Sequence, residues 1–333
     1  MKKWLIGIAI FFGVIIIVKQ LNHNDYSSAQ QFAKKGNYQE FYNQIKGGID
    51  KDDDNAQDIY AKTLCEAIAQ NDINSVEFLI SKNDSIINYD KTGDLRPLTC
   101  LFAYSYKNID IAMLKKILSY HPDLNYEIKQ WRNLTPLQAI SMNSKINNNL
   151  AVVQLLIENG ADVNYYKHDE SDSSVAPLLG FYTKDNFQGF KLLLKNKAIL
   201  PDSKKFDLLT NIASDYSLFL MKNLGKNYKL YKMPLSQNQK LILDAKKFND
   251  LHNKNMRYLK ELDSSNLLTY NDYSKRGLYH LALVFTSLDL RDGMDLLIKN
   301  GVCSQDKKRC LNMIKKANEM GNTEIANQLE KEI

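Results

Sequence analysis

The sequence predicts an all-α solenoid of antiparallel helix pairs, preceded by an N-terminal transmembrane helix. Three observations predict this fold class. Leucines that each open an apolar helical segment recur at spacings of 34, 39 and 41 residues, at Leu64, Leu98, Leu137 and Leu178. The chain has only 14 Gly and 6 Pro among 333 residues, too few for the closely spaced turns of an all-β protein. An uncharged, apolar run occupies residues 4–18.

Composition and charge exclude several classes of protein. Apolar residues make up 44% of the chain and charged residues 25%, which is ordinary for a folded protein and excludes a disordered one. Lys and Arg total 44 against 38 Asp and Glu, which gives a net charge of +6. Three of these lysines, Lys2, Lys3 and Lys19, flank the apolar run. The rest of the chain is nearly neutral, so binding to nucleic acid is not predicted.

Residues 1–24 have the pattern of an export signal. Lys2 and Lys3 precede the apolar run, a basic start that keeps this positive end in the cytoplasm, and Lys19 follows the run. As a helix the run would be about 22 Å long, which is shorter than the helix of ~20 residues that usually spans a membrane. We expect an uncleaved anchor that crosses the membrane through residues 4–18, with Lys19 reaching the interface.

A cleaved signal peptide is the alternative. Ser27 and Ala29 would suit a cleavage site, but they lie some way beyond the apolar run. Under both interpretations the chain from residue 25 onward is outside the cytoplasm. A composition rich in Lys and Asn and poor in Arg indicates a bacterial protein, so we expect a single-pass protein of the inner membrane with its repeats in the periplasm.

Two further landmarks repeat along the chain. Residues 151–161 and 293–302 match almost residue for residue, and each is a helix ended by Asn–Gly at the position of a left-handed C-cap. A short apolar–polar–Tyr segment follows the second helix of several repeats. Its occurrences are Ile87–Asn88–Tyr89, Leu124–Asn125–Tyr126, Val163–Asn164–Tyr165 and Leu268–Thr269–Tyr270.

This repeat resembles the ankyrin repeat. Thr135, Pro136 and Leu137 match the family's first-helix motif, and His280–Ala282 keeps the second half of that motif in a later repeat. In the second helix and the segment after it, the matching residues are Leu155, Leu156, Gly160, Ala161, Asp162, Val163 and Asn164. The resemblance implies helix pairs with short β-hairpin fingers over residues 25–333, about eight or nine repeats in all, with the signature degenerate at 205–265.

The resemblance also implies where a partner would dock. Finger tips of an ankyrin stack project in a row beside the concave groove, and aromatic side chains there offer large contact area at small entropic cost. We therefore predict a partner-binding row of finger aromatic residues. Local packing of these rings on neighbouring fingers is the alternative. The predicted residues are Tyr89, Tyr126, Trp131, Tyr165, Tyr166, Tyr270 and Tyr273.

The four cysteines give two different expectations. Cys303 and Cys310 could form a disulfide across the junction between the last two repeats in an oxidising compartment, or remain unpaired. Cys65 and Cys100 lie in first helices of successive repeats at non-equivalent positions, so we expect them to be small buried side chains.

Signals for catalysis and metal binding are poor. No nucleophile elbow, P-loop, zinc-binding helix motif or Cys-x-x-Cys occurs, so no enzymatic activity, cofactor, metal or small-molecule substrate is predicted. The acidic run 50–55 lacks the glycine and glutamate of a calcium loop, because Asn55 and Ala61 occupy those positions. His280 takes a structural position of the repeat, and His168–Glu170 is most simply a solvated loop.

The sequence therefore predicts a protein-binding protein and not an enzyme. One specific case is an immunity protein that neutralises a toxin in the periplasm, by analogy with other exported, anchored ankyrin proteins. The alternative is a scaffold that organises a resident complex of the envelope. A weaker third hypothesis is an enzyme that uses the acid–base residues His168–Glu170.

Overall fold

The computed structural model describes residues 26–90, 95–105, 107–131, 133–143, 145–147, 149–165, 176–200, 202–225, 243–268 and 275–333. The predicted membrane segment, residues 4–18, lies outside these ranges. The chain divides into two compact units, with unit 1 ending at Asp162 and unit 2 beginning at Val163. The parts that the structure describes are helical and contain no strand, which confirms the all-α fold class for them.

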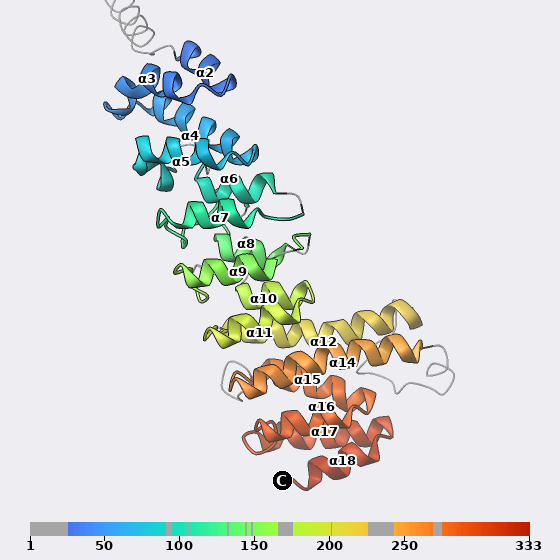
Figure 1. The fold of residues 1–333 in the computed structure, drawn as a ribbon. Coiled ribbons are helices and arrows are strands. Elements are labelled where there is room, and N and C mark those ends of the chain that lie inside the picture. Colours follow the sequence, from blue (N-terminus) through green and yellow to red (C-terminus); the bar gives the residue numbers. More distant parts are fainter. Residues whose placement is uncertain are drawn as a thin grey trace, which may run out of the picture. The chain divides into compact units, whose positions relative to one another are not determined.

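Unit 1 consists of antiparallel helix pairs (Figure 1). Within it, α3, α5, α7 and α9 form one row in which each helix contacts the next, while α2, α4 and α6 form a second row. The α-helices are α2 (Ser27–Lys34), α3 (Tyr38–Ile49), α4 (Asp54–Ala69), α5 (Ile73–Lys82), α6 (Pro97–Tyr104), α7 (Ile111–Leu118), α8 (Pro136–Met142) and α9 (Asn149–Glu158), and the short 3-10 helices are η1 (Asp84–Asn88) and η2 (Lys129–Trp131).

Helix starts in unit 1 follow from the sequence. The carboxylates of Asp53, Asp72 and Asp110 each accept a backbone N–H in the first turn of α4, α5 and α7. At α8, Thr135 and Gln138 form a reciprocal capping box, and a proline stands in the first turn, where its missing N–H has no intrahelical partner. These helices therefore begin at defined residues, even though α5, α7 and α8 are only two or three turns long.

The leucine landmarks form the core. Leu64 is fully buried, and Leu98, Leu137 and Leu178 are each 1% exposed. Burying one such side chain stabilises the fold by about 1.5–3 kcal/mol. Since these leucines lie on the first helices of successive pairs, their spacing sets the repeat of the core.

Unit 2 continues the pairing with longer helices. In one row α10 contacts α12, α12 contacts α15 and α15 contacts α17. Residues 202–224 and 245–264 contain neither Gly nor Pro, so nothing in them ends a helix, and α12 and α14 run for 23 and 20 residues. The helices are α10 (Pro177–Thr183), α11 (Phe187–Lys195), α12 (Asp202–Leu224), α14 (Ala245–Ser264), α15 (Lys275–Leu288), α16 (Arg291–Lys299), α17 (Lys307–Met320) and α18 (Thr323–Glu330).

Two features of the predicted fold class are not found in the described residues. Among the described residues the only β-type pairing is an isolated antiparallel bridge between Ile128 and Leu134. In these residues the expected hairpin fingers are therefore turns and 3-10 helices. None of the helices in the ranges above has the length and apolar character that a membrane crossing needs.

All four cysteines form disulfides. Cys65 of α4 is bonded to Cys100 of α6, with a Cα–Cα distance of 5.4 Å. Both side chains are buried as expected, at 2% and 4% exposure, but the expectation missed the bond between them. α4 and α6 are neighbours in one row, so residues at non-equivalent positions still meet. Cys303 and Cys310 are bonded to each other across the start of α17, with a Cα–Cα distance of 5.0 Å.

Candidate functional site

The asparagine of the Asn–Tyr landmark joins consecutive fingers. In three places its side-chain oxygen accepts a backbone N–H from the following finger region, at 2.8 Å each time. These bonds satisfy backbone donors that lie outside any helix. The donors and acceptors are Asp123 N–H to Asn88, Asp162 N–H to Asn125 and, in unit 2, Ile199 N–H to Asn164.

The tyrosine of the landmark folds back onto the first helix of its own pair. The Tyr89 hydroxyl donates to Asp58 Oδ1 at 2.6 Å. The Tyr126 hydroxyl is 2.6 Å from Thr99 Oγ1, and its ring lies 4.0 Å from the guanidinium carbon of Arg96. Tyr126 is only 7% exposed. For Tyr126, and to a smaller extent for half-buried Tyr89, the structure favours local packing over presentation to a partner.

The remaining finger aromatic residues fall into two groups. Tyr165 and Trp131 are half-buried and keep part of their rings at the surface. Tyr166, Tyr270 and Tyr273 lie outside the described residues, as do His168–Glu170. Tyr165 also has an interaction of its own, so among the described finger aromatic residues we take Trp131 as the candidate surface ring.

A tight turn places Trp131 at the tip of its finger. Ile128 N–H donates to the Leu134 carbonyl at 2.9 Å and closes the loop. Asn133 adopts a left-handed φ of 58° and donates its N–H to the Ile128 carbonyl at 3.1 Å. Asparagine tolerates this conformation better than most residues, so the turn is encoded locally.

Trp131 lines an apolar hollow of about 150 Å³ in unit 1. Three buried side chains, Phe102, Ile140 and Ile146, are between 1% and 4% exposed and form its floor. Trp131 and three other half-buried residues form its walls. The lining residues are Phe102, Trp131, Leu134, Ala139, Ile140, Asn143 and Ile146.

Two long connections lie beside the hollow: one contributes Asn143 and Ile146 to its lining, and the other is tied to it through Lys107. Residues 105–110 join α6 to α7 and residues 143–148 join α8 to α9, six residues each, whereas three residues join α4 to α5. Asn147 N–H donates to the Lys107 carbonyl at 2.7 Å, which ties one connection to the other. The sequence prediction named Trp131 but missed the rest of the hollow. The longer connections within these two helix pairs were the sequence feature that could have located the hollow.

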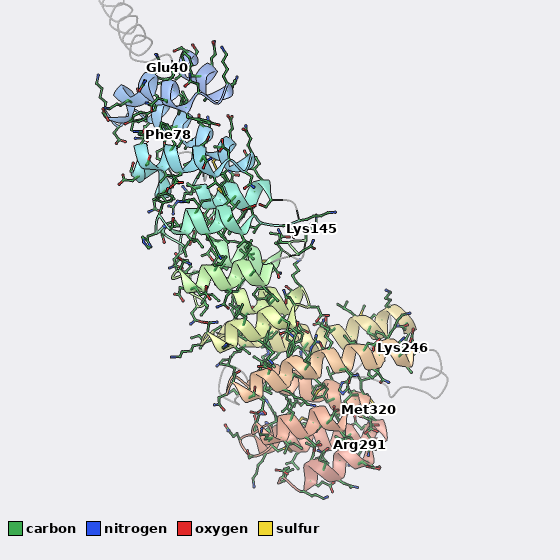
Figure 2. The ribbon with its side chains drawn as sticks, in the orientation of Figure 1. Glu40, Phe78, Lys145, Lys246, Arg291 and Met320 are labelled. Atoms are coloured by element: carbon green, nitrogen blue, oxygen red, sulfur yellow. A yellow bond between two sulfur atoms is a disulfide. The ribbon has the colours of Figure 1, made fainter. Side chains whose placement is uncertain are left out.

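The rim carries positive charge. Lys107 and Lys145 belong to the two connections, and Lys129 begins the 3-10 turn that ends at Trp131. All three side chains are exposed. Figure 2 shows Lys145 at the edge of the ribbon, where loop side chains extend away from the helices. An apolar floor with a cationic edge can hold an uncharged side chain while attracting negative charge around it.

A second hollow in unit 1 has a different chemical character. It has a volume of about 190 Å³ and lies between α2 and α4. Its lining mixes charges of both signs, Lys34 and Lys62 with Glu66. Three of its seven lining residues are charged, so it suits an apolar anchoring side chain less well than the hollow around Trp131.

In unit 2 a polar cluster that runs from buried Tyr216 to exposed Asp292 joins α12, α14 and α16. Tyr216 Oη is 2.9 Å from His252 Nδ1, and His252 Nε2 is 3.0 Å from Asp292 Oδ1. Burial raises the pKa of Tyr216 far above its ordinary range, so its phenol stays protonated and can donate to the imidazole. This arrangement resembles a relay, but the Tyr216 side chain is fully buried and so out of reach of a substrate, and the cluster links three helices.

The described residues contain no group of three or more His, Cys, Asp or Glu side chains able to hold a metal ion. Comparison with protein families matches one model, Ankyrin repeat, to residues 132–168. This stretch contains α8, α9 and the following turn, and with them Leu134, Ile140, Asn143 and Ile146 of the hollow. A search of curated proteins finds no match to the chain.

Proposed function

Since this chain is an ankyrin-repeat protein, matched to the family over residues 132–168, we propose that it binds another protein through the hollow around Trp131. The observation that carries the proposal is the apolar floor of Phe102, Ile140 and Ile146 beneath a half-exposed tryptophan. Pockets of this kind hold the anchoring side chains that supply most of the energy of a protein interface. Ankyrin repeats are typically interaction modules, and we propose no catalytic activity.

The test compares two substitutions of surface apolar residues. Trp131→Ala removes a wall of the hollow, and Leu218→Ala removes a side chain that is 62% exposed on α12 of unit 2. We expect Trp131→Ala to weaken capture of the partner about tenfold or more and Leu218→Ala to leave it unchanged. Circular dichroism confirms that both variants are folded. Equal capture by Trp131→Ala and the unmodified protein would show that the partner docks elsewhere.

We also propose that residues 4–18 anchor the protein in a bacterial inner membrane, with the repeats in the periplasm. The disulfides Cys65–Cys100 and Cys303–Cys310 support this location, because disulfides persist in oxidising compartments and are rare in the cytosol. Alkaline phosphatase fused after Ile333 folds only outside the cytoplasm. We expect an active fusion, and an inactive one would contradict the proposed orientation.

Among possible partners we propose a toxin delivered into the envelope, which would make the protein an immunity protein. A single tight partner and inhibition of that partner's activity by the purified chain are the expected results. The alternative is a scaffold for a resident envelope complex. That alternative predicts that affinity capture returns several envelope proteins together and that none of them loses activity on binding.

A further inference from the structure

We propose that the hollow around Trp131 takes one bulky apolar side chain from a partner segment whose flanking residues are acidic. This inference rests on the proposed protein-binding function and names the chemistry of the partner. Two features of unit 1 carry it: the size and lining of the hollow, and the net positive charge on its rim.

The hollow fits a single side chain. Its volume is about 150 Å³, and an apolar cavity of roughly that volume accepts a benzene-sized group. The floor residues Phe102, Ile140 and Ile146 offer no hydrogen-bonding atoms of their side chains. Asn143 is the one polar side chain of the lining, and its oxygen already accepts the Lys145 N–H at 3.0 Å. A polar or charged side chain on the floor would lose its water with little to replace it, so Phe, Leu, Ile or Met suits the site.

The rim supplies charge that the described part of the chain does not neutralise. Lys107, Lys129 and Lys145 are exposed, and in the described ranges none of them has an ion pair with an acidic side chain. Lys129 shares η2 with Trp131, and Lys145 precedes Ile146. Lys107 is placed beside them because its carbonyl accepts the N–H of Asn147, the neighbour of Ile146.

The acidic side chains nearest in the sequence already have partners. Asp110 Oδ1 accepts the Met113 N–H at 2.8 Å as the N-cap of α7. The Asp123 carboxylate oxygen Oδ2 lies 3.6 Å from a guanidinium nitrogen of Arg96. Glu127 is half-buried and also has an interaction of its own. A carboxylate that accepts an N–H keeps its negative charge, but Asp123 is offset by Arg96, and the three lysines outnumber Asp110 and Glu127. The rim is therefore net positive, and charge complementarity favours Asp and Glu on either side of the anchoring residue.

A protein segment suits this surface better than a nucleic acid. Single-stranded nucleic acids need a groove that follows their phosphates and several aromatic rings on which bases stack. Here a single ring, Trp131, stands over an aliphatic and aromatic floor sized for one group. An oligonucleotide nevertheless belongs in the test, because its binding would overturn the proposal.

The test uses Trp131 as its own reporter. The chain has only two tryptophans, Trp4 and Trp131, so Trp4→Phe leaves Trp131 as the single fluorophore in the full-length protein, held in detergent micelles. Three synthetic peptides serve as probes. The first has a central Phe flanked by Asp and Glu, the second replaces the acids by Asn and Gln, and the third replaces Phe by Ala.

We expect the acidic Phe peptide to shift Trp131 emission to shorter wavelength and to bind about tenfold tighter than either control peptide at low salt. Raising the salt should reduce this preference. Lys107→Glu, Lys129→Glu and Lys145→Glu combined should abolish or reverse it. The matched control combines Lys184→Glu, Lys195→Glu and Lys331→Glu, which are exposed lysines of unit 2, and should keep the preference.

Three outcomes would overturn the inference: equal binding of acidic and neutral peptides, no binding of any peptide, or tighter binding of an oligothymidine. Failure of this inference can be distinguished from failure of the proposed protein-binding function. If Trp131→Ala abolishes capture of the natural partner while the triple lysine variant does not, the hollow binds a partner that is not acidic. If neither change affects capture, the proposed binding surface itself is wrong.

Discussion

The side-chain oxygen of Asn88 accepts the backbone N–H of Asp123 at 2.8 Å and so ties the end of one helix pair to the finger of the next. In the adjoining residue, Tyr89, the hydroxyl donates to Asp58 of its own pair. The Asn–Tyr landmark therefore divides two tasks between neighbouring residues. The asparagine couples consecutive repeats, and the tyrosine holds the finger against the helix beneath it.

The hydrogen bond from the Asp123 N–H to Asn88 should contribute measurably to the free energy of unfolding. Asn88→Ala leaves the Asp123 N–H without its acceptor, and we expect the free energy of unfolding to fall by about 0.5–1.5 kcal/mol. Hydrogen exchange read by mass spectrometry should show faster exchange in the peptide containing Asp123. Asn108→Ala is the control, because Asn108 is an exposed loop residue. Unchanged exchange at Asp123 would mean that the bond contributes nothing.

Tyr126 should matter for folding more than for binding. Tyr126→Phe keeps the ring beside Arg96 and removes only the bond to Thr99, so we expect a loss of about 0.5–1.5 kcal/mol. Tyr126→Ala also removes a side chain that is 7% exposed, with a loss of about 3–5 kcal/mol. Urea unfolding measures both. The folded Tyr126→Phe variant should capture the partner as well as the unmodified protein does. Weaker capture would show that Tyr126 belongs to the binding surface.

The disulfide between α4 and α6 should stabilise unit 1. Four cysteines allow three complete pairings, and a digest without reduction should contain only the Cys65–Cys100 and Cys303–Cys310 linkages. Replacing Cys65 and Cys100 together by Ala should lower the free energy of unfolding by about 2–4 kcal/mol. A mixed linkage, or an unchanged stability of the double variant, would contradict the assigned bond.

His280 should make stability depend on pH. Burial, together with the nearby Arg276 charge, lowers its pKa from the ordinary 6.5. The unfolded chain then binds a proton at His280 at a higher pH than the folded chain, so the free energy of unfolding falls as the pH drops below about 6.5. His280→Gln should flatten this dependence in urea unfolding between about pH 7.5 and 5.5. Parallel curves for the two proteins would rule out the contribution of His280.

Much of the helical architecture follows from local sequence. Asp53, Asp72 and Asp110 mark helix starts, and Thr135–Pro136 opens α8 with a capping box that needs only neighbouring residues. Trp131 was predicted as a surface aromatic residue from its place in a finger. Its floor, Phe102 and Ile140, looked like ordinary core, since apolar residues at helical spacing say nothing about whether a neighbouring surface is hollow.

The finger tyrosines show why composition alone misleads. Tyr89 and Tyr126 stand at equivalent positions and invite the same interpretation as binding residues. In the structure their hydroxyls find Asp58 and Thr99, which lie 31 and 27 residues earlier in the chain. A buried tyrosine usually finds a partner for its hydroxyl, and which residue can serve is decided by the packing of the helix pair.

The sequence by itself determined the period of the repeat, the helix starts and the core leucines, because these depend on patterns within one helix pair. Only the tertiary structure decided that Cys65 bonds to Cys100, that Asn88 reaches Asp123, and that Trp131 stands over a hollow. Both of those bonds join residues 35 apart in sequence. Contacts at that separation depend on the register in which one pair stacks on the next, and the sequence of a single repeat does not specify that register.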